Sequence, residues 1–136
     1  MGVKYFRMFA LFFCVISSCN GVHHRQKAKD AELHVLGQRE LVLSSIGDSL
    51  YRVKSYLLAI KCLDTLIKID STNGRYYYMR GSCYGHAYPQ SEFRPEIDNY
   101  LKAIKLNYDK PKLYYDLGCA MQVQMTHWRS NTSGRV

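Results

Sequence analysis

The side chains best able to do chemistry in this chain of 136 residues are its five cysteines and five histidines. His23 and His24 follow Cys19 closely, and imidazole and thiolate groups are common zinc ligands. A zinc site needs three or four ligands at defined spacing, and these residues have no such partners. We therefore interpret this segment as a flexible polar stretch and predict that it holds no metal.

Three cysteines further along the chain, Cys62, Cys83 and Cys119, also lack a metal-binding or redox pattern. They form no CxxC pair and no Cys/His metal spacing. Because three is an odd number, a complete disulfide framework is not indicated either. We expect all three to be small, buried apolar side chains.

The sequence contains no motif for catalysis. It has no phosphate-binding glycine loop, no nucleophile elbow and no zinc-binding helix. Residues 131–133 match an N-glycosylation acceptor, which matters only in a eukaryotic secretory pathway. We therefore predict a protein that is not an enzyme and that uses no cofactor, metal or small-molecule substrate.

Length and composition indicate one globular domain. Apolar residues make up 47% of the chain and charged residues 22%, which argues against wholesale disorder. The net charge is +8, and two of these charges, Lys4 and Arg7, lie in a leader without acids, so the remainder carries +6. This excess favours anionic surfaces, but the basic residues are scattered, so nucleic-acid binding is not indicated.

Residues 1–18 have the three parts of a secretory signal peptide. Lys4 and Arg7 form the positive start, residues 8–16 are the apolar core, and two serines follow. The apolar core is too short to span a bilayer as a helix, which needs about 20 residues.

The end of this leader, Ile16-Ser17-Ser18-Cys19, resembles the cleavage box of bacterial lipoproteins. The resemblance implies that Cys19 receives a diacylglycerol, becomes the mature first residue and is acylated again. Several acyl chains would anchor the protein to a membrane, facing the periplasm or the exterior. The alternative is an ordinary secreted protein cut near Ser18 or Gly21. In the lipoprotein interpretation, residues 19–36 form a tether and lead-in to the fold.

The rest of the chain repeats itself. Residues 60–83 align with residues 97–120 at an offset of 37, and a third copy lies upstream at an offset of 34. Each copy contributes one glycine to a ladder of Gly47, Gly81 and Gly118. The three extra residues fall between positions 88 and 95, where two prolines mark a loop.

Apolar stripes of helical period predict five helices in this region, at 37–50, 53–69, 75–87, 95–106 and 111–126. Turn residues separate the helices at 71–74 and at 107–111. The last residues, 127–136, have no apolar stripe and are expected to form a polar tail.

Segments 114–118, 77–84 and 100–107 resemble the tetratricopeptide repeat, in which an aromatic residue, a glycine and a second-helix ending recur. Ala59 stands where the family has its crossing alanine. The resemblance covers about residues 40–124 and implies an all-α fold, an α-α superhelix of about two and a half repeats within residues 37–126. Departures are Glu96 and Leu66 in place of alanines, and the lack of the usual tryptophan.

A packing argument explains the glycine ladder. We expect a glycine at 47, 81 and 118 because two helices cross there and a β-carbon would push them apart. Glycine inside a helix costs about 0.5–1 kcal/mol relative to alanine, so its recurrence requires a gain of this kind.

In this family the concave face, formed by the first helix of each unit, usually binds other proteins. Periodicity predicts which side chains point there, and Tyr78 and Tyr115 are expected to form a stacked pair beside a basic edge of Arg75 and Lys112. The predicted peptide-binding residues are Arg52, Arg75, Tyr78, Ser82, His86, Lys112, Tyr115 and Gln122; Asp48 and Cys119 also point to this face.

The functional expectation is a non-catalytic adaptor or assembly factor that binds proteins or peptides of acidic character. One alternative is an accessory subunit that binds an anionic polymer, such as cell-wall glycan or nucleic acid, through its basic surface. Another is a truncated repeat protein without an independent role.

Overall fold

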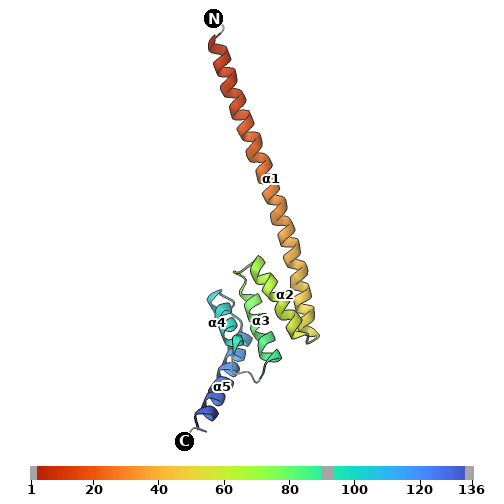
Figure 1. Ribbon diagram of the computed structural model, residues 1–136, viewed down its shortest axis with the longest axis vertical. Helices are drawn as coiled ribbons and strands as arrows, with labels where there is room; N and C mark the ends of the chain where they lie inside the picture. Colours follow the sequence, from red (N-terminus) through yellow and green to blue (C-terminus); the bar gives the residue numbers. More distant parts are fainter. Residues whose placement is uncertain (1–2, 90–93, 134–136) are drawn as a thin grey trace. The chain divides into compact units, whose positions relative to one another are not determined.

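The computed structural model describes the backbone of residues 3–89 and 94–133, and the side chains of residues 25–89, 94–130 and 132. Over this part of the chain the protein is entirely helical and contains no strand (Figure 1). The helices are α1 (Val3–Arg52), α2 (Tyr56–Ile69), α3 (Gly74–Ala87), α4 (Pro95–Lys105) and α5 (Pro111–Ser133). The prediction of an all-α protein is confirmed.

The three middle helices lie within three residues of their predicted bounds, but α1 and α5 are longer than predicted. α1 runs through the expected tether at 19–36, where helix-favouring Ala, Glu, Lys, Gln and Arg are frequent. α5 continues past residue 126 to Ser133, because no proline or glycine interrupts it before Gly134. The polar tail predicted for residues 127–136 is therefore largely helical.

The chain divides into two units, Met1–Arg39 and Glu40–Val136. The first unit consists of the early turns of α1, and all its described side chains, residues 25–39, are exposed. None of the described helices combines the length and apolar character that crossing a membrane requires.

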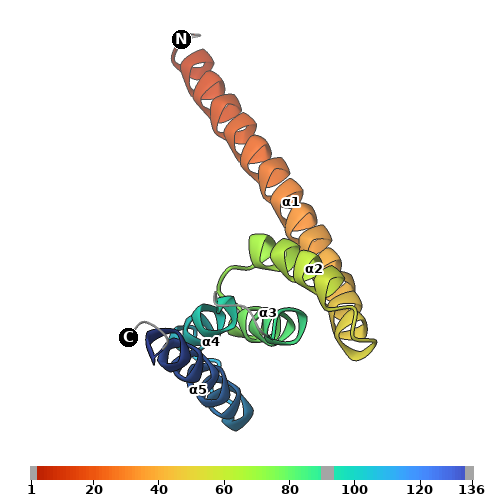
Figure 2. The ribbon, with the colours of Figure 1, turned by 60° about the horizontal axis from the view of Figure 1, so that its bottom comes forward.

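The second unit holds the core, and α3 is its middle helix (Figure 2). One buried cluster joins the end of α1 to α2 and α3 around Leu63 and Leu66, which are fully buried. Two further clusters join α3, α4 and α5 around Tyr100, Ala103 and Leu113. Each helix from the end of α1 to α5 therefore buries its apolar stripe against its neighbours in the chain.

Arg80 ties α3 to the helices on both sides. Its Nε atom donates to Asn99 Oδ1 on α4 at 2.8 Å, and its Nη1 atom donates to Asp64 Oδ1 on α2 at 2.6 Å. Asn99 is buried and donates in turn to the carbonyl oxygen of Pro95. One guanidinium group thus satisfies polar groups on two neighbouring helices.

The three ladder glycines occupy different surroundings. A β-carbon at Gly81 would lie 2.8 Å from Tyr100 Cε1 and 3.1 Å from Asn99 Cβ, whereas one at Gly47 would make ordinary contacts of 3.7 Å and longer. A β-carbon at Gly118 would meet nothing within 4 Å. The predicted close helix crossing is confirmed at Gly81. The prediction is wrong for Gly118, because no second helix follows α5 in the described chain. At Gly47 the neighbouring side chains leave enough room for a methyl group.

The ends of α1 and α4 have the same capping geometry. At the end of α1, Ser55 N–H donates to the carbonyl of Leu50 and Lys54 N–H donates to that of Tyr51, which is the Schellman arrangement. This places Lys54 in the left-handed region, with φ 61°, and the corresponding residue after α4, Asn107, has φ 59°. Asparagine tolerates this conformation, but lysine carries the cost of its β-carbon.

The glycine surroundings lead to a prediction with a built-in control. Gly81→Ala should lower the free energy of unfolding by about 1–3 kcal/mol, because the buried Tyr100 ring must move. Gly118→Ala should instead raise it by about 0.5–1 kcal/mol through helix propensity alone. Urea denaturation followed by circular dichroism would measure both. Equal effects of the two substitutions would contradict the packing described at Gly81.

A second prediction concerns the end of α1. Lys54→Gly should raise the free energy of unfolding by about 1–2 kcal/mol, because glycine adopts φ near 60° without a β-carbon clash. Asn107→Gly should give a smaller gain, since asparagine already tolerates this conformation. Thermal melts of the two variants would compare them, and a loss of stability in Lys54→Gly would show that this side chain has a stabilising contact.

Candidate functional site

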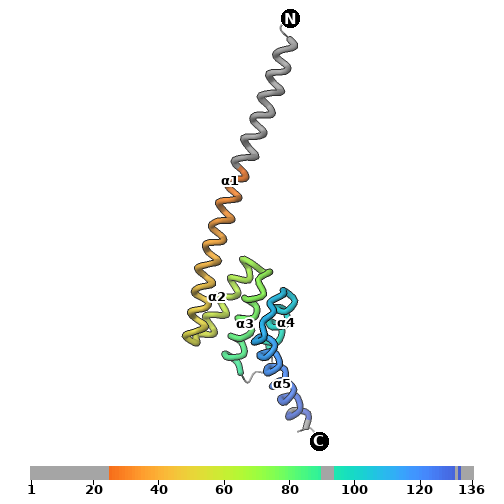
Figure 3. Tube along the Cα trace, turned by 180° about the vertical axis from the view of Figure 1, so that it is seen from behind, coloured from red at the N-terminus to blue at the C-terminus, as the bar shows by residue number. Residues whose placement is uncertain are grey.

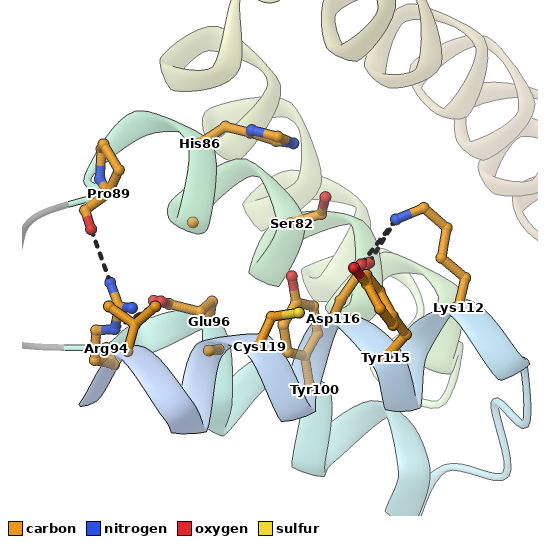
Figure 4. A pocket seen from close by; sticks show the side chains of 13 residues that line it. Ser82, His86, Pro89, Arg94, Glu96, Tyr100, Lys112, Tyr115, Asp116 and Cys119 are labelled. Carbon is orange, nitrogen blue, oxygen red and sulfur yellow. Dashed lines mark hydrogen bonds and ion pairs between the residues drawn. The ribbon is translucent and has the colours of Figure 1, made fainter. Parts of the chain in front are cut away.

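Two adjoining hollows lie in the second unit. The first, of about 530 Å³, is lined by residues from the end of α1, from α3 and from the start of α5, together with Tyr108. The second, of about 320 Å³, lies between α3, the start of α4 and α5 (Figure 4). Ser82 and Lys112 line both hollows, so the two form one continuous candidate surface.

The structure brings together seven of the eight predicted peptide-binding residues around these hollows. Arg52, Arg75 and Tyr78 line the first; His86 and Tyr115 line the second; Ser82 and Lys112 line both. Asp48 and Cys119 line the first and the second hollow, as their expected direction implied. Gln122 is exposed but lines neither hollow.

The predicted basic edge is present, but its charges are paired. Arg75 Nη2 lies 2.8 Å and 2.9 Å from the two carboxylate oxygens of Asp48. Lys112 Nζ lies 2.7 Å from Asp116 Oδ2, and this contact raises the lysine pKa. Arg52 has a weaker partner, because its Nη2 atom donates to Ser49 Oγ at 3.4 Å. The expected basic edge is therefore largely neutralised by its acidic neighbours, and among the described residues that line the hollows Arg52 is the cation without a carboxylate partner.

Tyr78 does not form the expected stacked pair with Tyr115. Its ring stacks on Tyr108 at a centroid distance of 5.3 Å and lies 5.8 Å from Tyr100 in a tilted arrangement. Its hydroxyl donates to Asp116 Oδ2 at 3.0 Å. Tyr108, in the turn after α4, thus occupies the place expected of Tyr115, and Tyr115 is 72% exposed and accessible to a ligand.

The Tyr78 hydroxyl is a poor acid in this setting. Burial raises its pKa to about 12, and the hydrogen bond to Asp116 and the charge of that carboxylate act in the same direction. Tyr78 therefore remains a neutral donor at physiological pH, with a fixed role in holding α5 to α3.

Ser82 forms the floor between the hollows. It is only 5% exposed, and its hydroxyl lies 2.9 Å from that of Tyr51, where either group could donate. Because Ser82 is buried, little of its side chain is accessible to a bound peptide. Its observed contact is the hydrogen bond that links α3 to the end of α1.

His86 is an exposed aromatic wall of the second hollow. Its ring stacks on Tyr56 of α2 at a centroid distance of 4.8 Å and an interplanar angle of 16°. Tyr51 contacts the same ring at 6.2 Å. The imidazole is thus held in place by α1 and α2 while its outer edge faces the hollow.

A buried ion pair closes the second hollow at the start of α4. Arg94 Nε lies 3.1 Å from Glu96 Oε1, and both side chains are more than nine-tenths buried. The Nε–H group is not aligned as a hydrogen bond, but Arg94 Nη1 donates to the Pro89 carbonyl at 3.1 Å. The pair explains how the Glu96 carboxylate can be buried: its charge is compensated locally by Arg94.

The cysteines differ from one another more than expected. Cys83 is fully buried, and burial raises its pKa to about 12; Cys62 is partly buried and its Sγ donates to the Leu43 carbonyl. Cys119 is exposed at the edge of the second hollow, so the prediction of three buried thiols is wrong at this position. Among the described residues, no group of three Cys, His, Asp or Glu side chains could hold a metal ion.

No family model, curated protein or solved structure matches this chain. The resemblances to tetratricopeptide repeats and to lipoprotein signals therefore remain predictions. Cys19, His23 and His24 lie outside the residues whose side chains the structure describes.

Sequence reasoning missed Asp116, which accepts hydrogen bonds from Tyr78 and Lys112 and so organises the centre of the surface. Its spacing of four residues from Lys112 was an available signal, since such pairs lie side by side on a helix. The Arg94–Glu96 pair had no comparable signal, because side chains two residues apart do not face each other within a helix; they meet here because Arg94 stands just before the first turn of α4, which holds Glu96.

Replacing Asp116 should change the ionisation of Tyr78. Asp116→Asn removes the acceptor charge, so the Tyr78 pKa should fall from about 12 toward its ordinary value of about 10. Because folding raises this pKa, the stability that Tyr78 contributes is fully present below pH 10 and is lost as pH rises toward 12. Tyrosinate absorbance during an alkaline titration would report the shift. The shift should be smaller when Asp116→Asn is introduced into Tyr78→Phe, where only the weaker effect of the Asp116 charge on the pKa of Tyr100 remains; an equal shift in both backgrounds would assign it to another tyrosine.

Proposed function

We propose that this chain is a non-catalytic protein-interaction module of tetratricopeptide type, which binds an extended polypeptide segment across the two hollows. The observation that carries the proposal is the meeting of seven predicted residues, from the ends and middles of α1, α3 and α5, around one continuous surface. A single helix face would not provide such a concave arrangement.

Equal burial at aligned positions of α2 and α4 supports a repeat. At the offset of 37, Ile60 is 7% exposed and Ile97 9%, while Leu66 and Ala103 are both fully buried. Ala59 is fully buried and its counterpart Glu96 is 3% exposed. Helices that occupy equivalent places in stacked hairpins would bury the same positions in this way.

The chemistry of the walls favours a ligand that brings mostly apolar and aromatic groups and few charges. Tyr115 and His86 offer exposed aromatic surface, and aromatic residues are frequent anchors of protein interfaces. Arg52 could bind one carboxylate without first breaking an ion pair, because its side chain pairs with no acid in the part of the chain that the structure describes. We therefore expect the bound peptide to need only one carboxylate, which would lie beside Arg52 near the end of α1.

The leader supports a location at the cell envelope. Lipidation of Cys19 would anchor the module on a membrane surface through acyl chains, and this part of the proposal does not depend on the hollows. Mass spectrometry of the mature amino terminus tests it directly, because a terminus other than an acylated Cys19 would exclude the anchor.

The binding surface can be tested with peptides selected from a random displayed library on the immobilised full chain. The double variant Arg52→Ala/Tyr115→Ala should bind the selected peptides at least tenfold more weakly, since each anchor typically contributes 1 kcal/mol or more. Fluorescence anisotropy with labelled peptides would measure the dissociation constants.

The control is Lys61→Ala/Lys105→Ala, which also removes two exposed side chains but lies outside both hollows. It should leave peptide affinity unchanged. Equal affinity of both double variants would exclude the hollows as the binding surface. A steep loss of affinity with salt for an anionic polymer, in place of peptide binding, would favour the polymer-binding alternative.

A further inference from the structure

One face of α5 carries an exposed apolar stripe that the rest of the described chain does not cover. It consists of Tyr114, Gly118, Met121, Met125 and Trp128, spaced alternately by four and three residues. The four large side chains are 48%, 47%, 64% and 69% exposed, in that order. Alternation of four and three is the spacing that keeps side chains on a single seam between paired helices.

The packed face of α5 is a different one. Leu113, Leu117 and Ala120 are buried against α3 and α4. On a helix with 3.6 residues per turn, this buried face is centred roughly 100° from the stripe. The stripe is therefore additional apolar surface, beyond what holds α5 in the fold.

Comparison with α3 indicates what the stripe lacks. At the offset of 37, Tyr114 corresponds to Tyr77, which is only 9% exposed. Gly118 corresponds to Gly81, which α4 crosses so closely that a β-carbon would meet Tyr100 at 2.8 Å. The face of α3 that receives α4 is thus the face that remains bare on α5, so a helix is the shape of partner that fits it.

We propose that this face pairs with α5 of a second copy of the chain, in an antiparallel two-fold arrangement. No charged residue belongs to the stripe, so two copies can approach without repulsion. The acid nearest to it on α5, Asp116, is already paired with Lys112. The stripe is also self-complementary in size, because large side chains such as Met121 of one copy can fill the space that Gly118 leaves on the other.

The antiparallel direction follows from which part of α5 packs against α3 and α4. The first turns of α5 are buried against α3 and α4, whereas the described residues from 121 onward are mostly exposed. Antiparallel pairing places the α2–α4 bundles of the two copies at opposite ends of the helix pair, and it sets the helix dipoles in opposite directions, which is favourable.

The available area predicts a weak dimer. Taking roughly 200 Å² for each large side chain, the exposed fractions give roughly 450 Å² per copy. Two copies with their flanking glutamines then reach about 1,000 Å², which is the lower bound for a specific interface. We therefore expect reversible association that depends on protein concentration.

Sedimentation of the full chain carrying Cys19→Ser, which prevents lipidation, would test the proposal. The mass should rise from monomer to dimer with concentration and stop there. Met121→Glu/Met125→Glu should weaken the association at least 100-fold, because it places charges in the seam. The matched control, Thr126→Glu/Ser130→Glu, adds the same charges at the same spacing on the same helix but away from the stripe and should still dimerise.

Several outcomes would overturn the proposal. They are a monomer at every concentration, assembly that continues beyond the dimer, or association that survives in Met121→Glu/Met125→Glu, as it would if the leader caused it. Circular dichroism of each variant checks that the helices are intact. Peptide binding at the hollows is measured separately, so the failure of one proposal leaves the other standing.

Discussion

The contact between Gly81 and the ring of Tyr100 is the constraint on which the rest of the second unit depends. It sets how closely α3 and α4 approach, and α3 is the helix that also packs on α2. Arg80, one residue earlier, donates to α2 and α4 at once and so fixes the same spacing by polar contacts. Close packing and hydrogen bonding therefore agree at one point along α3.

This arrangement also explains the hollows. Because α3 is the middle helix, its outer side chains lie between the end of α1 and the start of α5, where Arg75 meets Asp48 and Tyr78 meets Asp116. These contacts hold the walls in place, and the ion pairs among them neutralise most of the positive charge that lines the hollows. The surface is consequently organised by its own ion pairs, and a ligand must either compete with them or use aromatic contacts.

Much of the fold could be predicted from the sequence, because it follows from local patterns. Apolar spacing placed α2, α3 and α4 (Figure 3), and the glycine ladder indicated the crossing at Gly81. The pattern could not show that Gly118 lacks a crossing partner, since the glycine itself looks the same with or without a second helix. The helix ends were misjudged where only weak polar signals were available, at residues 19–36 and beyond 126.

The candidate surface was predicted in outline and missed in detail for a similar reason. Periodicity tells which way a side chain points, and seven of eight residues lie where it indicated. Periodicity does not show which neighbouring side chain packs against it. Tyr78 was expected to meet Tyr115, yet Tyr108 arrives from the end of α4, where the left-handed Asn107 turns the chain back.

The shared use of Asp116 links the walls of the hollows to the docking of the last helix. Its carboxylate accepts from Tyr78 on α3 and from Lys112 on α5. A ligand held by Arg52 and Tyr115 leaves both of these hydrogen bonds in place, so the walls of the hollows would keep their shape when a ligand is bound. The same bonds fix the first turns of α5 on α3, and they thereby set the direction in which the bare stripe of α5 points.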